Sequence, residues 1–278
     1  MSNSILTNGG ASFISAQMDK SRADQLRAQT QLASGLKNPD PANNPSGTAI
    51  SLKLGSDVII ARTIQDMAVQ GGSMVSLAVS VLNNTASVLN RLKELATLST
   101  STTINDTDRI NLQAEFAQLV SQVNSNAQTK FAGTVLFDGN FAGAIQLGLD
   151  ANDKVSVNFK DFQSATFGGG TDLTALNIST SIGTTTAVTA LDAALTALLS
   201  ELASVSAIKS RLEVANQNMG TIVQNYELAQ STYRDVNVTE ALANAQRAQA
   251  LVEAGSSALQ QNVNMFTSLS RMIQGGLR

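Results

Sequence analysis

The chain has 278 residues, of which 14% are charged and 4% aromatic, and its formal net charge is −3. It contains no His and no Cys, which excludes imidazole bases, thiol nucleophiles, disulfides and the usual zinc sites. The acidic balance argues against a general nucleic-acid binder, and no apolar run is long enough to predict membrane insertion. Residues 1–18 lack a basic stretch followed by an apolar core, so we expect any export to proceed without a cleaved signal peptide.

Residues 5–34 predict an amphipathic helix with one apolar stripe. All three prolines follow it, between Pro39 and Pro45. Because proline interrupts helices, we expect one short break there, with long helices on both sides. Ser46 is the predicted N-cap of the second helix.

The second helix is predicted from positions that recur three and four residues apart. These positions are Ile60, Thr63, Met67, Gln70, Met74, Leu77, Val81, Thr85, Val88, Leu92 and Leu95. A polar connection over residues 99–107 follows, with Asp106 or Thr107 as the predicted N-cap of a third helix. The third helix carries its apolar positions at Leu112, Phe116, Leu119, Val123, Ala127 and Phe131. The short connection predicts that the two helices are antiparallel neighbours.

The middle of the chain changes character. Residues 144–149 and 154–159 alternate apolar and polar side chains around an Asn/Asp-rich turn, which predicts a β-hairpin. The glycines at 168–170 and the threonines at 184–186 predict loops. Roughly 50 residues of β-structure and loop therefore interrupt a helical protein.

The longest periodic pattern lies in the C-terminal third. Its positions are Val188, Leu191, Leu195, Leu198, Leu202, Val205, Ile208, Leu212, Ala215, Met219, Ile222, Tyr226, Ala229, Tyr233 and Val236. Steps of three and four over this length predict a coiled-coil seam, which needs partner helices. Residues 234–237 predict a break, and residues 238–274 a final amphipathic helix. The methionines fall mostly on such stripes and are predicted to fill the core.

These elements predict a mainly α fold. It is a long antiparallel helical bundle or coiled coil of paired N- and C-terminal segments, with a small central β-hairpin and loop region. We expect three parts. Residues 1–45 with 236–278 form the terminal helices, 46–139 with 188–235 form a helical rod, and 140–187 form a small β-hairpin and loop segment.

The polar motifs predict structure rather than chemistry. Asp106 and Asp108 suit the start of a helix, where the dipole favours carboxylates. Asp150, Asn152 and Asp153 miss the spacing of a calcium loop and predict a turn. No catalytic residue, cofactor site or metal site is predicted, and the protein is not expected to be an enzyme.

Several short motifs then occur in a fixed order. They are QLASGLK at 31–37, DPANNPSG at 40–47, NRLKELA at 90–96, DTDR at 106–109, SRLE at 210–213 and RDVN at 234–237. The series resembles bacterial flagellins, over about residues 1–139 and 188–270. The departures are the Pro-rich loop at 41–45, a longer C-terminus and a middle segment with almost none of the family's outer domains.

The resemblance implies a structural subunit that self-assembles into the helical flagellar filament used for swimming motility. The terminal helices would form the filament's inner core, and the short middle segment would lie at the outer surface. Implied partners are other copies of the chain, hook-junction and filament-cap proteins, the flagellar export apparatus and a chaperone. The implied location is extracellular. The expected filament-core contacts are Ile5, Leu6, Phe13, Leu251, Leu259, Val263, Phe266 and Leu269.

Arg91, Leu95 and Glu115 correspond to positions that matter when flagellins are sensed by the vertebrate Toll-like flagellin receptor, whereas Leu119 stands at a position that is basic in those flagellins. Two alternatives remain open. One is a hook–filament junction protein, which would share the helical termini. The other is a flagellin-like surface adhesin, whose only aromatic side chains for stacking on a sugar would be Phe141, Phe159, Phe162 and Phe167.

Overall fold

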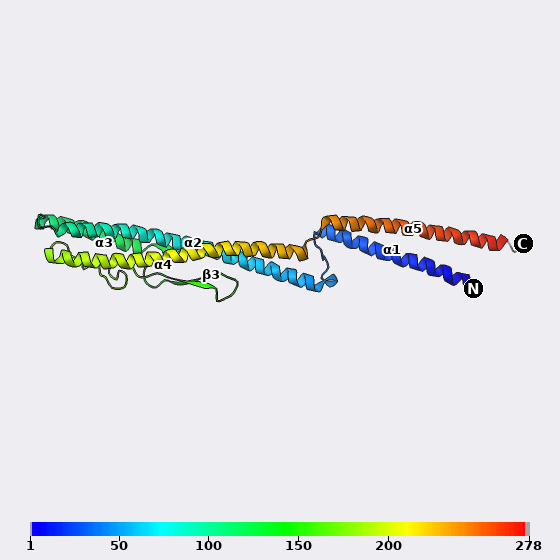
Figure 1. Cartoon of the computed structure of the whole chain (residues 1–278), viewed down its shortest axis with the longest axis horizontal. Helices are drawn as coiled ribbons and strands as arrows, with labels where there is room; N and C mark the ends of the chain where they lie inside the picture. The colour runs from blue at the N-terminus through cyan, green and yellow to red at the C-terminus, as the bar shows by residue number, and fades with distance from the viewer. Residues whose placement is uncertain (1, 276–278) are drawn as a thin grey trace. The chain divides into compact units, whose positions relative to one another are not determined.

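The structure is a computed structural model that describes residues 2–275, with the backbone alone described for 2–9, 269, 270 and 273–275. Figure 1 shows the long helices and the strand β3. The described residues form five α-helices, one short 3₁₀-helix and two small antiparallel hairpins. The elements are α1 (Ser2–Ser34), η1 (Pro41–Asn43), α2 (Pro45–Ser99), α3 (Asp106–Ala127), β1 (Lys130–Phe131), β2 (Thr134–Val135), β3 (Ala142–Gln146), β4 (Lys154–Asn158), α4 (Ser181–Arg234) and α5 (Val238–Gly275). The mainly α fold with a small β region is confirmed.

The chain forms two compact units, and α2 and α4 contribute to both. Unit 1 comprises residues up to 57 and from 225 onward, and unit 2 comprises residues 58–224. The segment 140–187 lies within unit 2 and contributes Val155, Val157 and Phe159 to its core.

In unit 2, α2 packs antiparallel to both α3 and α4. Contacts between α2 and α3 pair Thr85 with Asn126 and Arg91 with Glu115, so the sequence numbers run in opposite directions. Lys93 pairs with Asp192 at 2.5 Å across α2 and α4. The predicted antiparallel pairing of the second and third helices is therefore confirmed.

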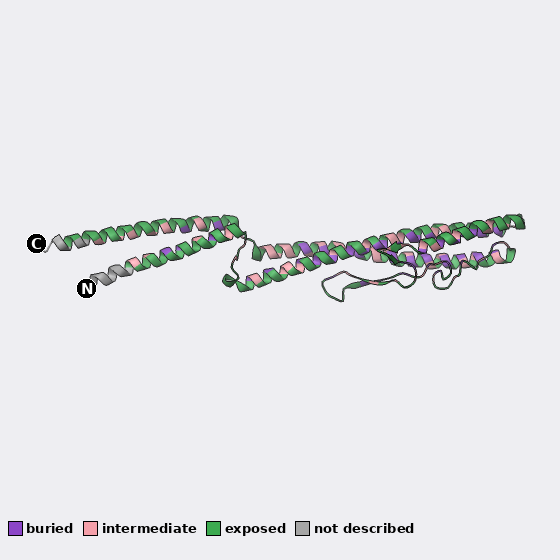
Figure 2. Ribbon diagram, turned by 180° about the vertical axis from the view of Figure 1, so that it is seen from behind, coloured by how far each residue is buried: buried purple, intermediate pink, exposed green. Residues whose placement is uncertain are grey.

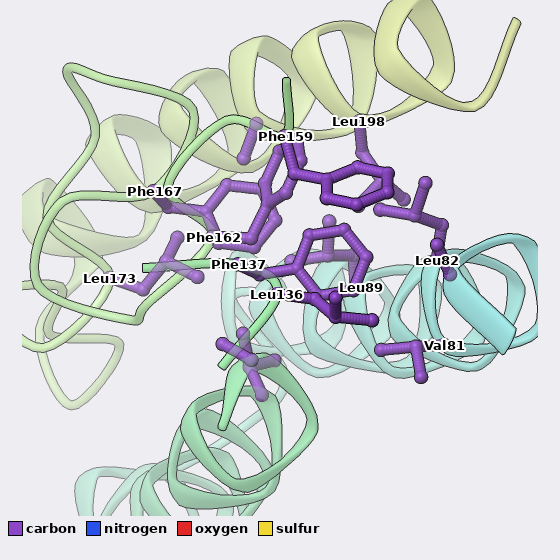
Figure 3. Close-up of a cluster of buried hydrophobic side chains, with 14 of the residues drawn as sticks. Val81, Leu82, Leu89, Leu136, Phe137, Phe159, Phe162, Phe167, Leu173 and Leu198 are labelled. Carbon is purple, nitrogen blue, oxygen red and sulfur yellow. The ribbon is translucent and has the colours of Figure 1, made fainter. Parts of the chain in front are cut away.

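The core of unit 2 includes side chains from both the helices and the β region. Figure 3 shows Leu82, Leu89 and Leu198 from the helices around Phe137 and Phe159. The rings of Phe137 and Phe159 lie 5.3 Å apart. Burial of such side chains stabilises the fold by about 1.5–3 kcal/mol each.

The predicted β-hairpin is confirmed as β3 and β4, paired antiparallel from Ala142 opposite Asn158 to Gln146 opposite Lys154. A Cβ atom added at Gly71 would come within 2.4 Å of Ile145, so this glycine gives the hairpin room against α2. A second hairpin, of β1 and β2, was not predicted. Its two turn residues, Ala132 and Gly133, have φ of 49° and 88°, which is typical of a type I′ turn.

Three helix starts differ from the prediction. The side chain of Asn44, not Ser46, accepts from the N–H of Gly47, and Pro45 takes the first helical position. Asn105, not Asp106 or Thr107, caps α3 by accepting from the N–H of Asp108 at 2.9 Å. The fourth helix begins at Ser181, so residues 184–186 are helical rather than loop.

Two predicted stripes also need correction. On α2, Ile60 and Met67 are 45% and 44% exposed, while the small Ala61 and Ala68 are buried. On α4, the seam is buried at Leu191, Leu198, Val205, Leu212, Ala215 and Met219 as predicted. Towards its end the seam does not continue, since Tyr233 is 42% exposed and Val236 lies beyond the helix. Phe131 belongs to β1 rather than to the third helix.

By length and composition alone, α2 and α4 are each apolar enough to cross a membrane. Apolar residues of both helices pack against other elements of the protein, since Leu82 and Leu92 of α2 and Leu198 of α4 belong to one buried core cluster. Helices that line the core of a protein in water meet the same criterion.

Candidate functional site

The candidate site is the pair formed by α1 and α5 within unit 1. The two helices run antiparallel, because Gly10 faces Asn262 and Gly255 faces Met18. Their seam follows a heptad pattern of buried and half-buried positions. On α1 these are Ala11, Ile14, Met18, Ser21, Gln25 and Ala28, and on α5 they are Ala241, Ala245, Ala248, Val252, Gly255, Leu259, Asn262 and Phe266.

This seam is narrow and made largely of small or polar side chains. Figure 2 shows that most of the described surface of both helices is exposed. Seam positions such as Ala28 and Ala248 remove little apolar area from water, so the pair gains little hydrophobic stabilisation from them.

Large apolar side chains instead project into solvent. Phe13 is 72% exposed, Val263 58% and Leu251 47%. Leu259 and Phe266 are half-buried in the seam. Ile5, Leu6 and Leu269 lie on the two helices, at positions whose side chains are outside the described residues.

The expected contact set omitted other exposed apolar residues of the same pair. They are Leu26, Val238, Leu242, Met265 and Met272. Met265 and Met272 are 63% and 75% exposed, which contradicts their prediction as core filler. Met265 follows Leu251 by fourteen residues and Met272 follows Met265 by seven, and this heptad spacing is the sequence signal that could have identified the second stripe.

Backbone hydrogen bonds connect the segment that follows α1 to the segment that precedes α5, and we call this region the joint. The predicted break at 234–237 is confirmed, and Asn237 caps α5 by accepting from the N–H of Glu240 at 3.3 Å. The N–H of Lys37 donates to the Arg234 carbonyl at 2.7 Å, and the N–H of Val236 donates to the Gly35 carbonyl at 3.0 Å. We call this pair of hydrogen bonds the joint bridge.

Local geometry supports the joint bridge. Gly35 has φ of +71°, the left-handed conformation that ends helices and that glycine adopts readily. The side chain of Gln31 donates to the Lys37 carbonyl at 2.6 Å. Asp235 accepts from the guanidinium of Arg234 at 2.9 Å, and hydrogen bonds from Arg234 and Ser231 lower the pKa of Asp235.

The residues expected to contact an immune receptor lie in unit 2. Arg91 binds Glu115 and Glu94 at 2.8 Å each, and these hydrogen bonds raise its pKa. The side chains of Arg91 and Glu115 are 44% and 45% exposed. Leu95 is only 1% exposed, so in this fold a partner reaches the ion pair but not Leu95.

The aromatic residues of the middle segment do not form an exposed platform. Phe159, Phe162 and Phe167 are at most 3% exposed, and Phe141 is half-buried against Phe159. This corrects the sugar-stacking role considered for them. Among the described residues, no three or more acidic side chains are grouped to hold a metal ion.

Comparison with known proteins matches the two helical regions on either side of the middle segment. Residues 5–142 match the bacterial flagellin N-terminal helical region, and residues 188–272 match the bacterial flagellin C-terminal helical region. The chain is 25% identical to a flagellar filament core protein of Brachyspira hyodysenteriae, covering 99% of both chains. It is 25% identical to the flagellar filament 30.7 kDa core protein of Treponema maltophilum, covering 92% of this chain and 95% of the relative.

A solved structure shows a related fold. A flagellar hook-associated protein from Vibrio parahaemolyticus has a TM-score of 0.60 at 11% identity, covering 69% of this chain and 100% of that one. Bacillus cereus flagellin has a TM-score of 0.49 at 26% identity, covering 57% of this chain and 88% of that one.

Proposed function

Because the chain belongs to the bacterial flagellin family and is a structural subunit of the flagellar filament, we propose that the paired helices α1 and α5 are its main contact with neighbouring copies. The observation that carries this proposal is the exposure of Phe13, Leu251 and Val263 beside a seam of small residues. Exposed apolar stripes of this extent indicate a partner. Ile5, Leu6, Leu259, Phe266 and Leu269 belong to the same proposed contact.

The pair suits a polymer because its two faces differ. The seam holds α1 to α5 within one copy, and the exposed side chains of Phe13, Leu251 and Val263 are left for contact with other copies. When a contact between unlike surfaces of identical subunits does not close into a ring, it generates a helical filament. Burial of the exposed side chains of Phe13, Leu251 and Val263 alone supplies about 4–9 kcal/mol before the costs of ordering and association.

We also propose three functional parts with the boundaries predicted from the sequence. Residues 1–45 with 236–278 would line the inner core, 46–139 with 188–235 would form the rod, and 140–187 would face outward. In this proposal the protein acts by assembly alone, without catalysis or a cofactor. Hook-junction and cap proteins, the export apparatus and a chaperone would be its other partners, with export not using a cleaved signal peptide.

The test is salt-induced polymerisation of the purified chain, with and without filament seeds, followed by electron microscopy. Phe13→Asp and Val263→Asp are expected to raise the critical concentration by about tenfold or more, because each places a charge in an apolar contact. Ile182→Asp is the matched control, since Ile182 is 87% exposed in unit 2. Equal elongation by all three variants would contradict the proposal.

An immune-receptor contact is a separate proposal about unit 2. Its accessible part is the ion pair of Arg91 and Glu115. Arg91→Ala is expected to weaken binding to the vertebrate Toll-like flagellin receptor without affecting filament elongation. Unchanged receptor binding would refute the proposed contact.

A further inference from the structure

The methionines of the chain divide into two groups by exposure. Six of the seven have described side chains. Met18, Met74 and Met219 are at most 7% exposed, whereas Met67, Met265 and Met272 are 44%, 63% and 75% exposed. The two most exposed methionines both lie on α5, seven residues apart, and so on one face of that helix.

Met265 and Met272 continue the apolar face of α5 that includes Leu251. Under the function proposed above, the apolar residues of α1 and α5 contact other copies of the chain. Both thioethers are therefore open to solvent in the free chain and covered in the polymer. Their accessibility depends on assembly, unlike that of the three buried methionines.

A thioether that is open to solvent reacts with peroxides. A lone pair of the sulfur attacks one oxygen of hydrogen peroxide, the O–O bond breaks, an S–O bond forms and water leaves. The sulfur is oxidised by two electrons and the peroxide is reduced by two, so no further reactant is needed. The product is methionine sulfoxide, in which a polar S–O group replaces an apolar thioether.

We propose that Met265 and Met272 are peroxide-oxidation sites that control assembly. They are oxidised in the free chain and protected in the polymer, and their sulfoxides keep a chain out of the polymer. In the free chain the S–O groups stay hydrated, so the pairing of α1 with α5 is kept. In an apolar contact between copies the same groups would lose their water, which opposes association. This proposal rests on the homopolymer proposed above and adds a chemical control of it.

Met18 shows how oxidation at a buried site would differ. It lies in the seam between α1 and α5, where a Cβ atom added at Gly255 would come within 2.6 Å of its side chain. A sulfoxide at this position would disturb the seam itself. Oxidation of Met18 would therefore speed hydrogen exchange of both helices, whereas oxidation of Met265 and Met272 is expected to leave their exchange unchanged.

The first measurement compares oxidation rates in the free chain and in filaments grown from it. Both are treated with hydrogen peroxide, and sulfoxide is quantified at each methionine by peptide mass spectrometry. In the free chain, Met265 and Met272 should oxidise about tenfold faster than the three buried methionines, and in filaments they should slow by about tenfold. Equal rates in free chain and filaments would overturn this inference and leave the contacts proposed for Phe13 and Val263 intact.

The second measurement is elongation from seeds after the same treatment. Oxidation of the unsubstituted chain is expected to raise the critical concentration by about tenfold. A variant with both Met265→Leu and Met272→Leu keeps apolar side chains of similar volume that peroxide does not oxidise. Whatever its starting value, its critical concentration should change less than about twofold on treatment. Met67→Leu is the matched control and should respond as the unsubstituted chain does.

Methionine sulfoxide reductases should restore elongation of the oxidised chain as the sulfoxides at 265 and 272 disappear. This arm decides the question if the double variant does not elongate untreated. Normal elongation of the oxidised chain, an equal peroxide response of the double variant, or reduction at both positions without recovery would each overturn the inference. Failure of the untreated chain to elongate, even from seeds, would overturn the proposed function as well.

Discussion

The joint bridge makes a specific prediction about Val236→Pro. Proline removes the N–H that donates to the Gly35 carbonyl at 3.0 Å, and its ring would occupy the space of that hydrogen bond. We therefore expect the whole bridge to open, including the bond from Lys37 to Arg234. Two backbone hydrogen bonds at about 1 kcal/mol each give about 2 kcal/mol, or roughly a 30-fold rise in the open population.

Hydrogen exchange of the full-length chain measures this change residue by residue. The seam is at most 4% exposed near the joint, at Ala28, Ala241 and Ala248, and only half-buried at Ile14 and Phe266 further along. We expect protection in the unsubstituted chain to be highest near the joint and to fall towards the chain ends. Val236→Pro should lower the protection near Ala28 and Ala241 by about 30-fold, and leave the core of unit 2 unchanged.

Val238→Pro is the matched control. Val238 is the first residue of α5, a position where proline is tolerated because the N–H has no partner within the helix. It is 60% exposed and takes no part in the joint bridge. Equal loss of protection in both variants, or none in Val236→Pro, would refute the role assigned to the bridge.

Three further predictions concern single side chains. Arg109→Ala should lower the free energy of unfolding of unit 2 by about 2–3 kcal/mol, measured by urea unfolding. The reason is that the largely buried guanidinium donates to the carbonyls of Ser99 and Ser101 at the end of α2. A change below about 0.5 kcal/mol would contradict this. Gly255→Leu should weaken the pairing of α1 with α5, seen as faster hydrogen exchange of both helices, because even a Cβ atom there would lie 2.6 Å from the Met18 side chain; unchanged exchange would show that Met18 moves away freely. Asp235 has a lowered pKa, so its stabilising effect on the joint exists above the ordinary pKa of an aspartate and is lost as pH falls through the lowered value. Asp235→Asn should therefore reduce the acid sensitivity of exchange near the joint, and an undiminished acid response would assign that sensitivity to other groups.

The long helices and the central hairpin could be predicted because their periodic patterns are local. Which face of α2 is buried could not be predicted, because the heptad positions Ile60 and Met67 are regularly spaced but are exposed. Periodicity identifies a stripe but does not say which of two stripes meets the partner in the same chain. The alanines that face inward, such as Ala61 and Ala68, give a weak pattern because they are small.

Features that depend on contacts between distant residues were also missed. The joint bridge connects Gly35 to Val236, and no local pattern reports such a pairing. The helix starts at Pro45 and Asp106 were misplaced by only one or two residues, since Asn and Ser both suit an N-cap. The outward face of α1 and α5 could be predicted at Phe13 and Val263, but not at Met265, because methionine suits cores and surfaces alike.

The alanines along the seams of unit 2 have a mechanical consequence. Ala61, Ala78, Ala187 and Ala194 are fully buried on α2 and α4. Alanine has no side-chain torsion that could adjust to a sliding neighbour, and it lets helix axes approach to about 8 Å. When closely packed helices slide past each other, their backbone atoms repel strongly, because no side-chain rotamer can change to relieve the contact. Unit 2 should therefore resist bending and twisting, a material property that suits a fibre under rotational load.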